Sequence, residues 1–209
     1  MLFLNRLEIQ GFKSFANKTV FDLPSNITGI VGPNGSGKSN IVDALRWVLG
    51  ERAAKNLRGE SLENLIFAGT PKKAPAGFAR VLLSFNNASR VFPFDSEEVV
   101  IERKVDKAGI SQFFINGAET KLRELTPILA RAKLGTRGLT IIGQGQSDLF
   151  VKSGGKERRA MIEEILGLKE YRLKKDDAER RLVSSGINME RTRAMIEEIA
   201  PHLKFLRRQ

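Results

Sequence analysis

The sequence predicts an α/β fold in which a phosphate-binding loop joins a sheet to a helix, followed by one long helix. Three observations support this prediction. Residues 32–39 read Gly-Pro-Asn-Gly-Ser-Gly-Lys-Ser, which fits the phosphate-loop pattern G-x-x-x-x-G-K-[ST]. Short apolar runs bounded by turn residues predict a mixed or antiparallel sheet. From residue 156 onward charged residues dominate and apolar residues follow heptad spacing, which predicts an emerging coiled-coil helix.

The first elements lead directly into the phosphate loop. Residues 2–9, in which Leu7 and Ile9 alternate with polar neighbours, predict a strand, and residues 19–23, ended by Pro24, predict a second. Residues 26–31 read Asn-Ile-Thr-Gly-Ile-Val and predict a short buried strand that enters the loop. Residues 40–49 predict a helix with its apolar side chains on one face, and Gly50 is the expected glycine at its C-terminal end.

The loop itself predicts a site for nucleotide phosphates. Glycines permit backbone angles and close approaches that a Cβ would block, so that successive N–H groups can surround an anion. Lys38 adds a positive charge at the β/γ-phosphates, and the Ser39 hydroxyl can ligate Mg²⁺. The N-terminal end of the following helix favours the same anion. The alternative is a Gly/Ser turn that binds nothing.

The middle of the chain predicts a second group of strands and a helix. A basic loop that carries Arg58 follows the first helix, and residues 70–77 form a turn-rich connection. Three strands are then expected at 79–85, 99–104 and 112–115, with a hairpin turn at Asn116-Gly117 and a helix at 122–134 closed by Gly135.

A glycine-flanked glutamine follows the next apolar run. Residues 139–142 read Leu-Thr-Ile-Ile and predict a buried strand, and Gly143-Gln144-Gly145 comes directly after it. Because strand ends line the ligand site in α/β sheets of this kind, Gln144 is a candidate contact for Mg²⁺ or for the attacking water. A plain polar turn is the alternative.

The C-terminal part predicts a helix of unusual length. Counting from Leu168 in steps of three and four places apolar residues at nine of twelve positions up to Leu206. The seam is interrupted by Lys175, Ser185 and Thr192, and Gly186 and Pro201 are expected to bend or loosen it. An amphipathic helix pair packed on the domain is the alternative to a coiled coil. No cap or turn closes the helix, so we expect a chain cut in mid-helix.

Composition limits the possible functions. With 209 residues and 41% hydrophobic content, the chain can form one domain of ordinary size. It has no cysteine and one histidine, His202, which argues against disulfides, cysteine nucleophiles, Ser-His-Asp triads and multi-histidine metal sites. No signal-peptide or membrane-spanning run is evident, so we expect a soluble cytoplasmic protein without a membrane partner.

The charge balance points to a polyanion. Lysine and arginine number 35 against 24 aspartate and glutamate residues, for a net charge of +11. Nucleotide phosphates need only a few cations, so nucleic acid is the expected recipient of the remainder. The alternative, equally open here, is a basic fragment whose acidic partner segment is absent.

Taken together, these segments resemble the N-terminal part of the SMC (structural maintenance of chromosomes) ATPases in their bacterial form. The resemblance covers nearly the whole chain. The residues that carry it are Gly11-Phe12-Lys13-Ser14-Phe15, Gly32 to Ala44, Arg46-Trp47-Val48-Leu49-Gly50-Glu51, Leu57-Arg58-Gly59, Leu65-Ile66-Phe67-Ala68-Gly69 and Ile142-Gly143-Gln144-Gly145-Gln146.

The resemblance implies a P-loop fold that forms the N-terminal lobe of an ABC-type ATPase head, with residues 1–165 as half of the head and 166–209 as the start of a coiled-coil arm. It implies ATP and Mg²⁺ as cofactors. The expected partners are the C-terminal half of the same head, a second head in a homodimer, DNA and accessory kleisin-type subunits, at the nucleoid in the cytoplasm.

The resemblance also implies residue roles. Roles in hydrolysis fall on Lys38, Gln144 and Arg58, the last through stimulation by DNA, and Mg²⁺ would be held by Ser39 and Gln144. The nucleotide would contact Lys13, Ser14, Gly32, Pro33, Asn34, Gly35, Ser36, Gly37, Lys38, Ser39 and Asn40.

Two departures limit the expected activity. No apolar run followed by Asp-Glu is present, so the Walker B carboxylates and an obvious general base are missing. Ser153-Gly154-Gly155-Lys156 is the only candidate ABC signature, and we reject it because a charged helix follows instead of a Walker B strand.

These departures predict that the chain is an ATPase only when the C-terminal half-head and a second head complete the site, and that alone it is inactive. Three other readings stay open. They are a coiled-coil ABC ATPase of DNA double-strand-break repair, a self-sufficient P-loop enzyme such as a kinase, and an interaction module with a degenerate loop. The first is the main alternative, the kinase would need its own Walker B Asp, and the intact Gly37-Lys38-Ser39 argues against degeneracy.

Overall fold

The computed structural model describes residues 2–24, 27–51, 63–134, 141–142, 149–166 and 168–206. The chain forms two compact units, Met1–Leu168 and Lys169–Gln209, which are described separately. The functional boundary expected after residue 165 stays a prediction. No described helix is both long and apolar enough to cross a membrane.

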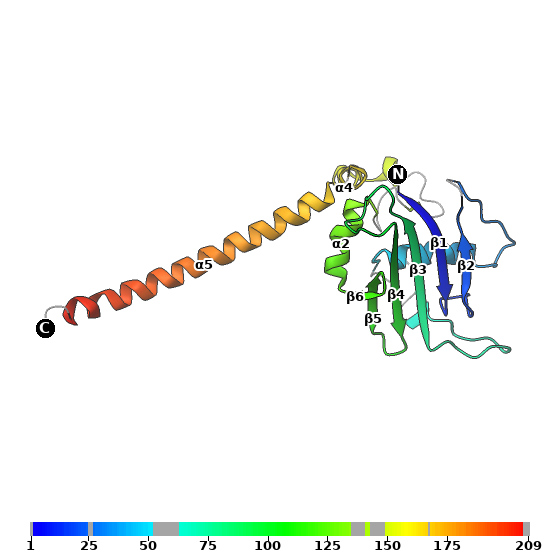
Figure 1. The fold of residues 1–209 in the computed structure, drawn as a ribbon, viewed down its shortest axis with the longest axis horizontal. Coiled ribbons are helices and arrows are strands. Elements are labelled where there is room, and N and C mark those ends of the chain that lie inside the picture. The colour runs from blue at the N-terminus through cyan, green and yellow to red at the C-terminus, as the bar shows by residue number, and fades with distance from the viewer. Residues whose placement is uncertain are drawn as a thin grey trace. The chain divides into compact units, whose positions relative to one another are not determined.

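The first unit is built on a six-stranded sheet in the order β2-β1-β3-β4-β5-β6, in which every neighbouring pair is antiparallel (Figure 1). Its strands are β1 (Phe3–Gln10), β2 (Thr19–Asp22), β3 (Phe78–Asn86), β4 (Glu98–Asp106), β5 (Ser111–Ile115) and β6 (Ala118–Thr120). Five of the six strands, all except β6, were predicted from the sequence, and the antiparallel option for the sheet is confirmed.

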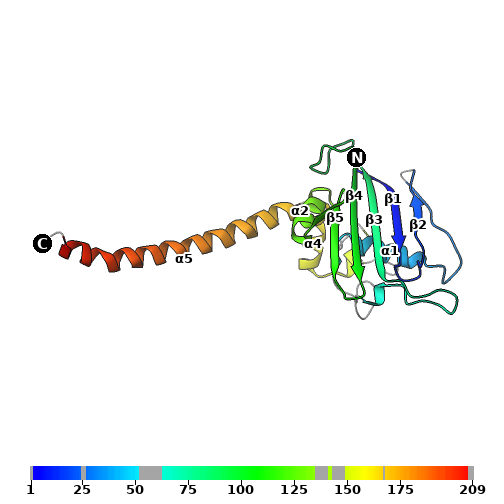
Figure 2. The ribbon, with the colours of Figure 1, turned by 60° about the horizontal axis from the view of Figure 1, so that its bottom comes forward.

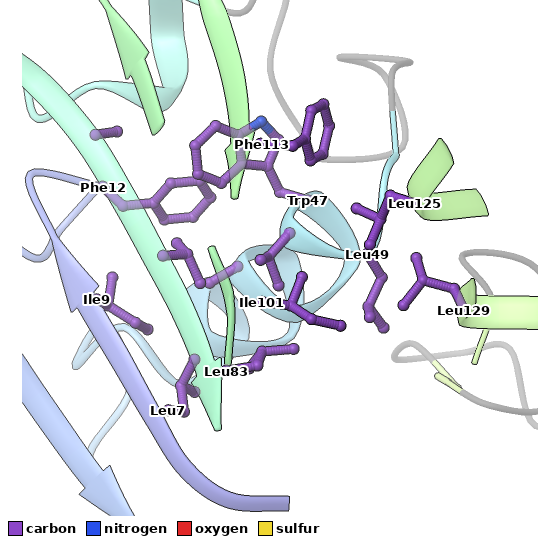
Figure 3. Close-up of a cluster of buried hydrophobic side chains, with 14 of the residues drawn as sticks. Leu7, Ile9, Phe12, Trp47, Leu49, Leu83, Ile101, Phe113, Leu125 and Leu129 are labelled. Carbon is purple, nitrogen blue, oxygen red and sulfur yellow. The ribbon is translucent and has the colours of Figure 1, made fainter. Parts of the chain in front are cut away.

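The helices of this unit are α1 (Lys38–Val48), α2 (Leu122–Arg131), α3 (Leu149–Lys152) and α4 (Gly155–Ile165), with a 3₁₀ turn η2 (Glu63–Leu65). α1 packs on β3 and β4 and lies across one face of the sheet (Figure 2). The core forms between them, where alternate residues of the strands meet the buried Ala44, Trp47 and Val48 of α1 (Figure 3).

Local turn signals are confirmed at two places, and a third turn differs from the prediction. Gly50 has φ 102°, and the bonds from Gly50 N to Trp47 O and from Glu51 N to Arg46 O close α1 in a Schellman motif. Asn116 and Gly117 both have positive φ and form the tight β5–β6 hairpin. α2 ends earlier than predicted because Lys133, with φ 57°, adopts the left-handed conformation that we assigned to Gly135.

The outer face of the sheet is polar and paired. Arg80 on β3 donates two hydrogen bonds of 2.7 Å from Nε and Nη2 to the carboxylate of Glu102 on β4. This hydrogen bonding raises the pKa of Arg80, and the charges of Glu102 and Glu8 raise it further against the opposing effect of burial. The ion pairs on this face join neighbouring strands without contributing to the core.

The strand predicted at residues 26–31 is wrong for the described part of that segment. Residues 27–33 have no regular structure, and the side chains of Ile27 and Val31 are 90% and 93% exposed. A buried strand needs neighbours that satisfy its backbone and cover both faces. Within the described ranges all six strands belong to the antiparallel sheet, and none pairs with this segment.

The strand predicted at residues 139–142 falls mostly outside the described residues, and Ile141 and Ile142 are not in a strand.

The Glu124 side chain in the first turn of α2 joins this helix to the end of β6. Its carboxylate accepts hydrogen bonds from Lys121 N and Thr120 Oγ1. These bonds lower the pKa of Glu124 below its usual value, the backbone bond contributing most.

The second unit consists of α5 (Lys169–Leu206), a helix of 38 residues that is about 57 Å long. It runs without a break through Gly186 and Pro201. The described apolar residues of the predicted seam are exposed: Tyr171, Leu182, Met189, Ile196, Ile199 and Leu206. The long helix is confirmed, and the packed helix pair is not seen among the described residues of this unit.

Candidate phosphate-binding site

The phosphate loop is an irregular segment that ends in the first turn of α1. Gly35 and Gly37 have φ values of 82° and 93°, in the region that favours glycine, and Ser36 N donates to Pro33 O at 3.3 Å. Gly37 is the N-cap of α1 and makes no side-chain capping bond, and no acidic residue lies in the first turn. The positive end of the helix is therefore available to an anion.

Lys38 folds back across this loop. Its Nζ donates to the carbonyl oxygens of Gly32 at 2.5 Å and of Pro33 at 2.7 Å. An ammonium has three N–H donors, so these two bonds fix the charge above the loop and leave a donor for a phosphate oxygen. The geometry suits the predicted role of Lys38 at the β/γ-phosphates.

A tight turn from the end of β1 lies against the loop. Phe12 and Phe15 exchange backbone hydrogen bonds of 3.1 and 2.8 Å, and Lys13 N donates to Leu65 O. Gly11 precedes this turn with φ 62°, and a Cβ there would lie 2.0 Å from Phe78 O. The turn of residues 12–15 is thus fixed by β3 on one side and by Leu65, the last residue of η2, on the other.

Ser14, Gly37 and Asn40 meet at the point of contact. Asn40 Nδ2 donates to Ser14 Oγ at 2.9 Å, and a Cβ on Gly37 would lie 2.7 Å from the same oxygen. Glycine at position 37 therefore permits both the positive φ of the backbone and the close approach of Ser14. The sequence placed these residues in one site, and the structure brings them together.

Lys13 points away from the loop, toward the side of α1. Its Nζ lies 2.6 Å from Oδ2 of Asp43, and the two side chains are only 11% and 4% exposed. The predicted contact of Lys13 with nucleotide stays a prediction, because in this structure its ammonium is paired with α1. The sequence analysis gave Asp43 no role, although it lies in the segment Gly32 to Ala44, and its function becomes recognisable only as the partner of Lys13.

The metal ligands are only partly described. Ser39 lies exposed in the first turn of α1, beside Lys38, where its hydroxyl can supply one of the oxygen ligands that Mg²⁺ accepts together with phosphate oxygens and water. Within the described ranges no group of three or more His, Asp or Glu residues could hold a metal. Arg58 and Gln144 lie outside the described residues.

One hydrogen bond joins Ile141 to α1. Arg46 on α1 donates from Nη2 to Ile141 O at 3.3 Å, three residues before Gln144 in the sequence. The segment that leads to Gln144 is therefore attached to the same helix that presents Lys38 and Ser39.

Comparison with known proteins identifies the family of this fold and site. The model of the RecF/RecN/SMC N-terminal domain matches residues 3–189. The chain belongs to this family. The resemblance to SMC proteins noted in the sequence is confirmed, as is the assignment of the fold to the P-loop, ABC-type ATPase heads.

Curated relatives agree over the whole chain. The chain is 43% identical over 208 residues to the Chromosome partition protein Smc of Desulfitobacterium hafniense and 42% identical over 208 residues to that of Mycobacterium leprae. Each alignment covers 100% of this chain and 17% of the relative. The chain thus spans about a sixth of the length of these proteins.

Solved SMC heads share the fold. The Smc head domain of Pyrococcus furiosus with an extended coiled coil, bound to the C-terminal domain of ScpA, has a TM-score of 0.76 and 40% identity. That alignment covers 100% of this chain and 52% of the other. A chain from a structure of ATP-driven dimerization and DNA-stimulated activation of SMC ATPases has a TM-score of 0.70 and 41% identity, with 78% and 99% covered. A RecF–ATP structure at 22% identity and a TM-score of 0.53 shares the fold alone.

The ion pair between Lys13 and Asp43 can be tested by a double-mutant cycle. Lys13→Met should lower the free energy of unfolding by about 3 kcal/mol, because it removes the ammonium from a buried carboxylate. Lys13→Met with Asp43→Leu should lose about 1 kcal/mol or less, since both charges are then gone. Urea denaturation measures each value.

Lys18→Met is the matched control, because Lys18 pairs with Glu8 at 2.8 Å but is half exposed. It should cost less than about 1 kcal/mol. A loss in Lys13→Met no larger than in this control would contradict a structural role for the buried pair.

Proposed function

We propose that this chain is the ATP-binding half of an SMC-type ATPase head that acts in chromosome condensation and partition. The observation that carries the proposal is the geometry of Lys38, whose ammonium is held over an α1 N-terminus without acidic residues. That arrangement suits a polyphosphate. Identities above 40% to proteins of chromosome partition support SMC function over the DNA-repair alternative.

The proposed residue roles follow from the site. The backbone N–H groups of Gly32 and of residues 34–37, with Lys38, would bind ATP phosphates, while Ser14 and Asn40 contact the loop and support it. Ser39 and Gln144 would ligate Mg²⁺, which neutralises charge on the phosphates during transfer. Arg58 would link hydrolysis to DNA. Lys13 would hold α1 through its ion pair with Asp43, and it would affect nucleotide binding indirectly, through the position of that helix.

The site is proposed to be half of a complete one. The sequence contains no Walker B carboxylate for water activation, and the apolar segment that leads into the phosphate loop is not in a strand, with Val31 93% exposed. The Smc head of Pyrococcus furiosus is a chain of which this one covers 52%. We infer that a C-terminal half-head adds strands beside residues 27–31 and supplies the missing carboxylates, which would bury Ile27 and Val31.

Partners follow from the same proposal. ATP bound between two heads in a homodimer would engage them and hydrolysis would release them, a nucleotide-dependent shift between two states. One related structure concerns the ATP-driven dimerization and DNA-stimulated activation of SMC ATPases, and another contains a head bound to ScpA. We extend these to DNA and to a kleisin-type subunit as partners here, at the nucleoid.

The half-site proposal predicts that the isolated chain does not hydrolyse ATP, while a mixture with the C-terminal half-head does. Lys38→Ala in the mixture should lower the hydrolysis rate at least about 100-fold, because the phosphoryl group loses its fixed positive charge. Phosphate release measures the rate.

Lys72→Ala is the control, since Lys72 lies in an exposed turn outside the site, and its rate should be unchanged. Hydrolysis by the isolated chain that disappears in Lys38→Ala would refute the half-site proposal.

The DNA proposal predicts sequence-independent, salt-sensitive binding by the assembled head. For three or four phosphate contacts, the affinity should fall about 40- to 150-fold between about 50 and 200 mM salt. Fluorescence anisotropy with two unrelated duplexes measures both dependences. An isotherm that does not change with salt would argue against a basic DNA-binding surface.

A further inference from the structure

Arg103 is a buried cation that none of the roles above uses. It lies on β4, its side chain faces the core, and the residue is only 3% exposed. A buried guanidinium is costly unless its donors are satisfied. Its contacts therefore indicate what position it holds in the fold.

The contacts of Arg103 join two strands to the end of α1. Nη1 donates to Trp47 O and to Glu51 O, both at 2.8 Å, and Nε donates to Ser111 Oγ on β5 at 2.9 Å. Trp47 and Glu51 belong to the Schellman turn that ends α1. A cation at this end is also favoured by the helix dipole.

Aromatic rings continue this link across the core. The guanidinium carbon of Arg103 lies 4.6 Å from the ring centroid of Phe113 and 4.8 Å from that of Trp47. The Trp47 ring in turn lies 5.3 Å from that of Phe12. Figure 3 shows Phe113, Trp47 and Phe12 in one row above the aliphatic core. The row thus runs from β5 through Arg103 and α1 to the turn of residues 12–15.

That turn is the one that contacts the phosphate loop. Phe12 begins it, and Ser14, two residues later, lies against Gly37 and Asn40. Arg103 therefore acts on α1 in two ways. It holds the C-terminal end directly, and through Trp47 and Phe12 it supports the turn beside the N-terminal end, about 16 Å away along α1.

We propose that Arg103 is a positioning residue for the phosphate site, which it serves by fixing α1 and the turn of residues 12–15 relative to the sheet. The inference rests on the proposed ATP-binding function. Because α1 carries Lys38 and Ser39, a small displacement of the helix moves both relative to a bound nucleotide. Arg103 itself touches neither nucleotide nor metal.

Three variants separate positioning from general stability. Arg103→Met keeps an unbranched apolar chain but removes every donor, and Arg103→Lys keeps the charge without the planar fork of donors. Arg80→Met is the matched control. Arg80 lies on the neighbouring strand with two equally short bonds to Glu102, but it faces the opposite side of the sheet.

The first measurement is amide hydrogen exchange in the 209-residue chain. A general loss of stability lowers protection equally in α1 and in the sheet. Positioning by Arg103 predicts that Arg103→Met lowers protection of Val42–Leu45 about tenfold relative to Val81–Leu83, while Arg80→Met changes the two alike. The fluorescence of Trp47, the only tryptophan in the chain, should shift in Arg103→Met and not in Arg80→Met.

The second measurement is the affinity of the assembled head for Mg-ATP, at a temperature where each variant is folded. We expect affinity to fall about tenfold in Arg103→Met and about threefold in Arg103→Lys, and to stay within about twofold of wild type in Arg80→Met.

Uniform loss of protection in Arg103→Met, or Mg-ATP affinity within about twofold of the wild-type head, would overturn the inference. If the wild-type head binds no nucleotide, the proposed function fails instead. The exchange comparison alone then decides whether Arg103 positions α1.

Discussion

The packing of α1 against the inner face of β3 and β4 is the constraint on which the rest of the structure depends. The helix begins at the phosphate loop and ends in the Schellman turn held by Arg103. Because a helix is a rigid rod, fixing its buried face also fixes the direction of its free N–H groups. The turn of residues 12–15 then borders the loop through its contacts with Gly37 and Asn40.

Local signals made much of this fold predictable. Gly50 and Asn116-Gly117 marked turns that have positive φ values, and the runs of apolar residues located β1 to β5. The phosphate loop was recognisable because its chemistry depends on residues that are adjacent in the sequence. The ion pair of Lys13 with Asp43 and the contacts of Arg103 with Trp47 join residues 30 and 56 positions apart, and nothing in the sequence marks those pairs.

The prediction of a strand at residues 26–31 was wrong for the same reason, because a strand also depends on a partner that is distant in the sequence. The composition of these residues favours burial, since Ile27, Ile30 and Val31 are apolar, but all three are exposed in this structure. A strand, however, is a property of a pair, and its hydrogen bonds need a neighbour. The apolar composition of this segment and its exposed side chains are consistent if the strand that pairs with it lies in another part of the assembled head. Sequence alone reveals the tendency and not the location of the partner.

The distribution of charge gives the DNA proposal a location. Ion pairs such as Lys13–Asp43 and Arg80–Glu102 contribute nothing to the net charge of +11, so the surplus belongs to other cations. Residues 1–168 contain 24 lysines and arginines against 17 acidic residues, whereas α5 contains 9 against 7. Positive and negative charges alternate along the helix and keep it in solution. Its apolar seam would pack against a second helix in a coiled coil. The first unit carries +7 of the net charge of +11, so the DNA proposal includes the head as well as the helix that follows it.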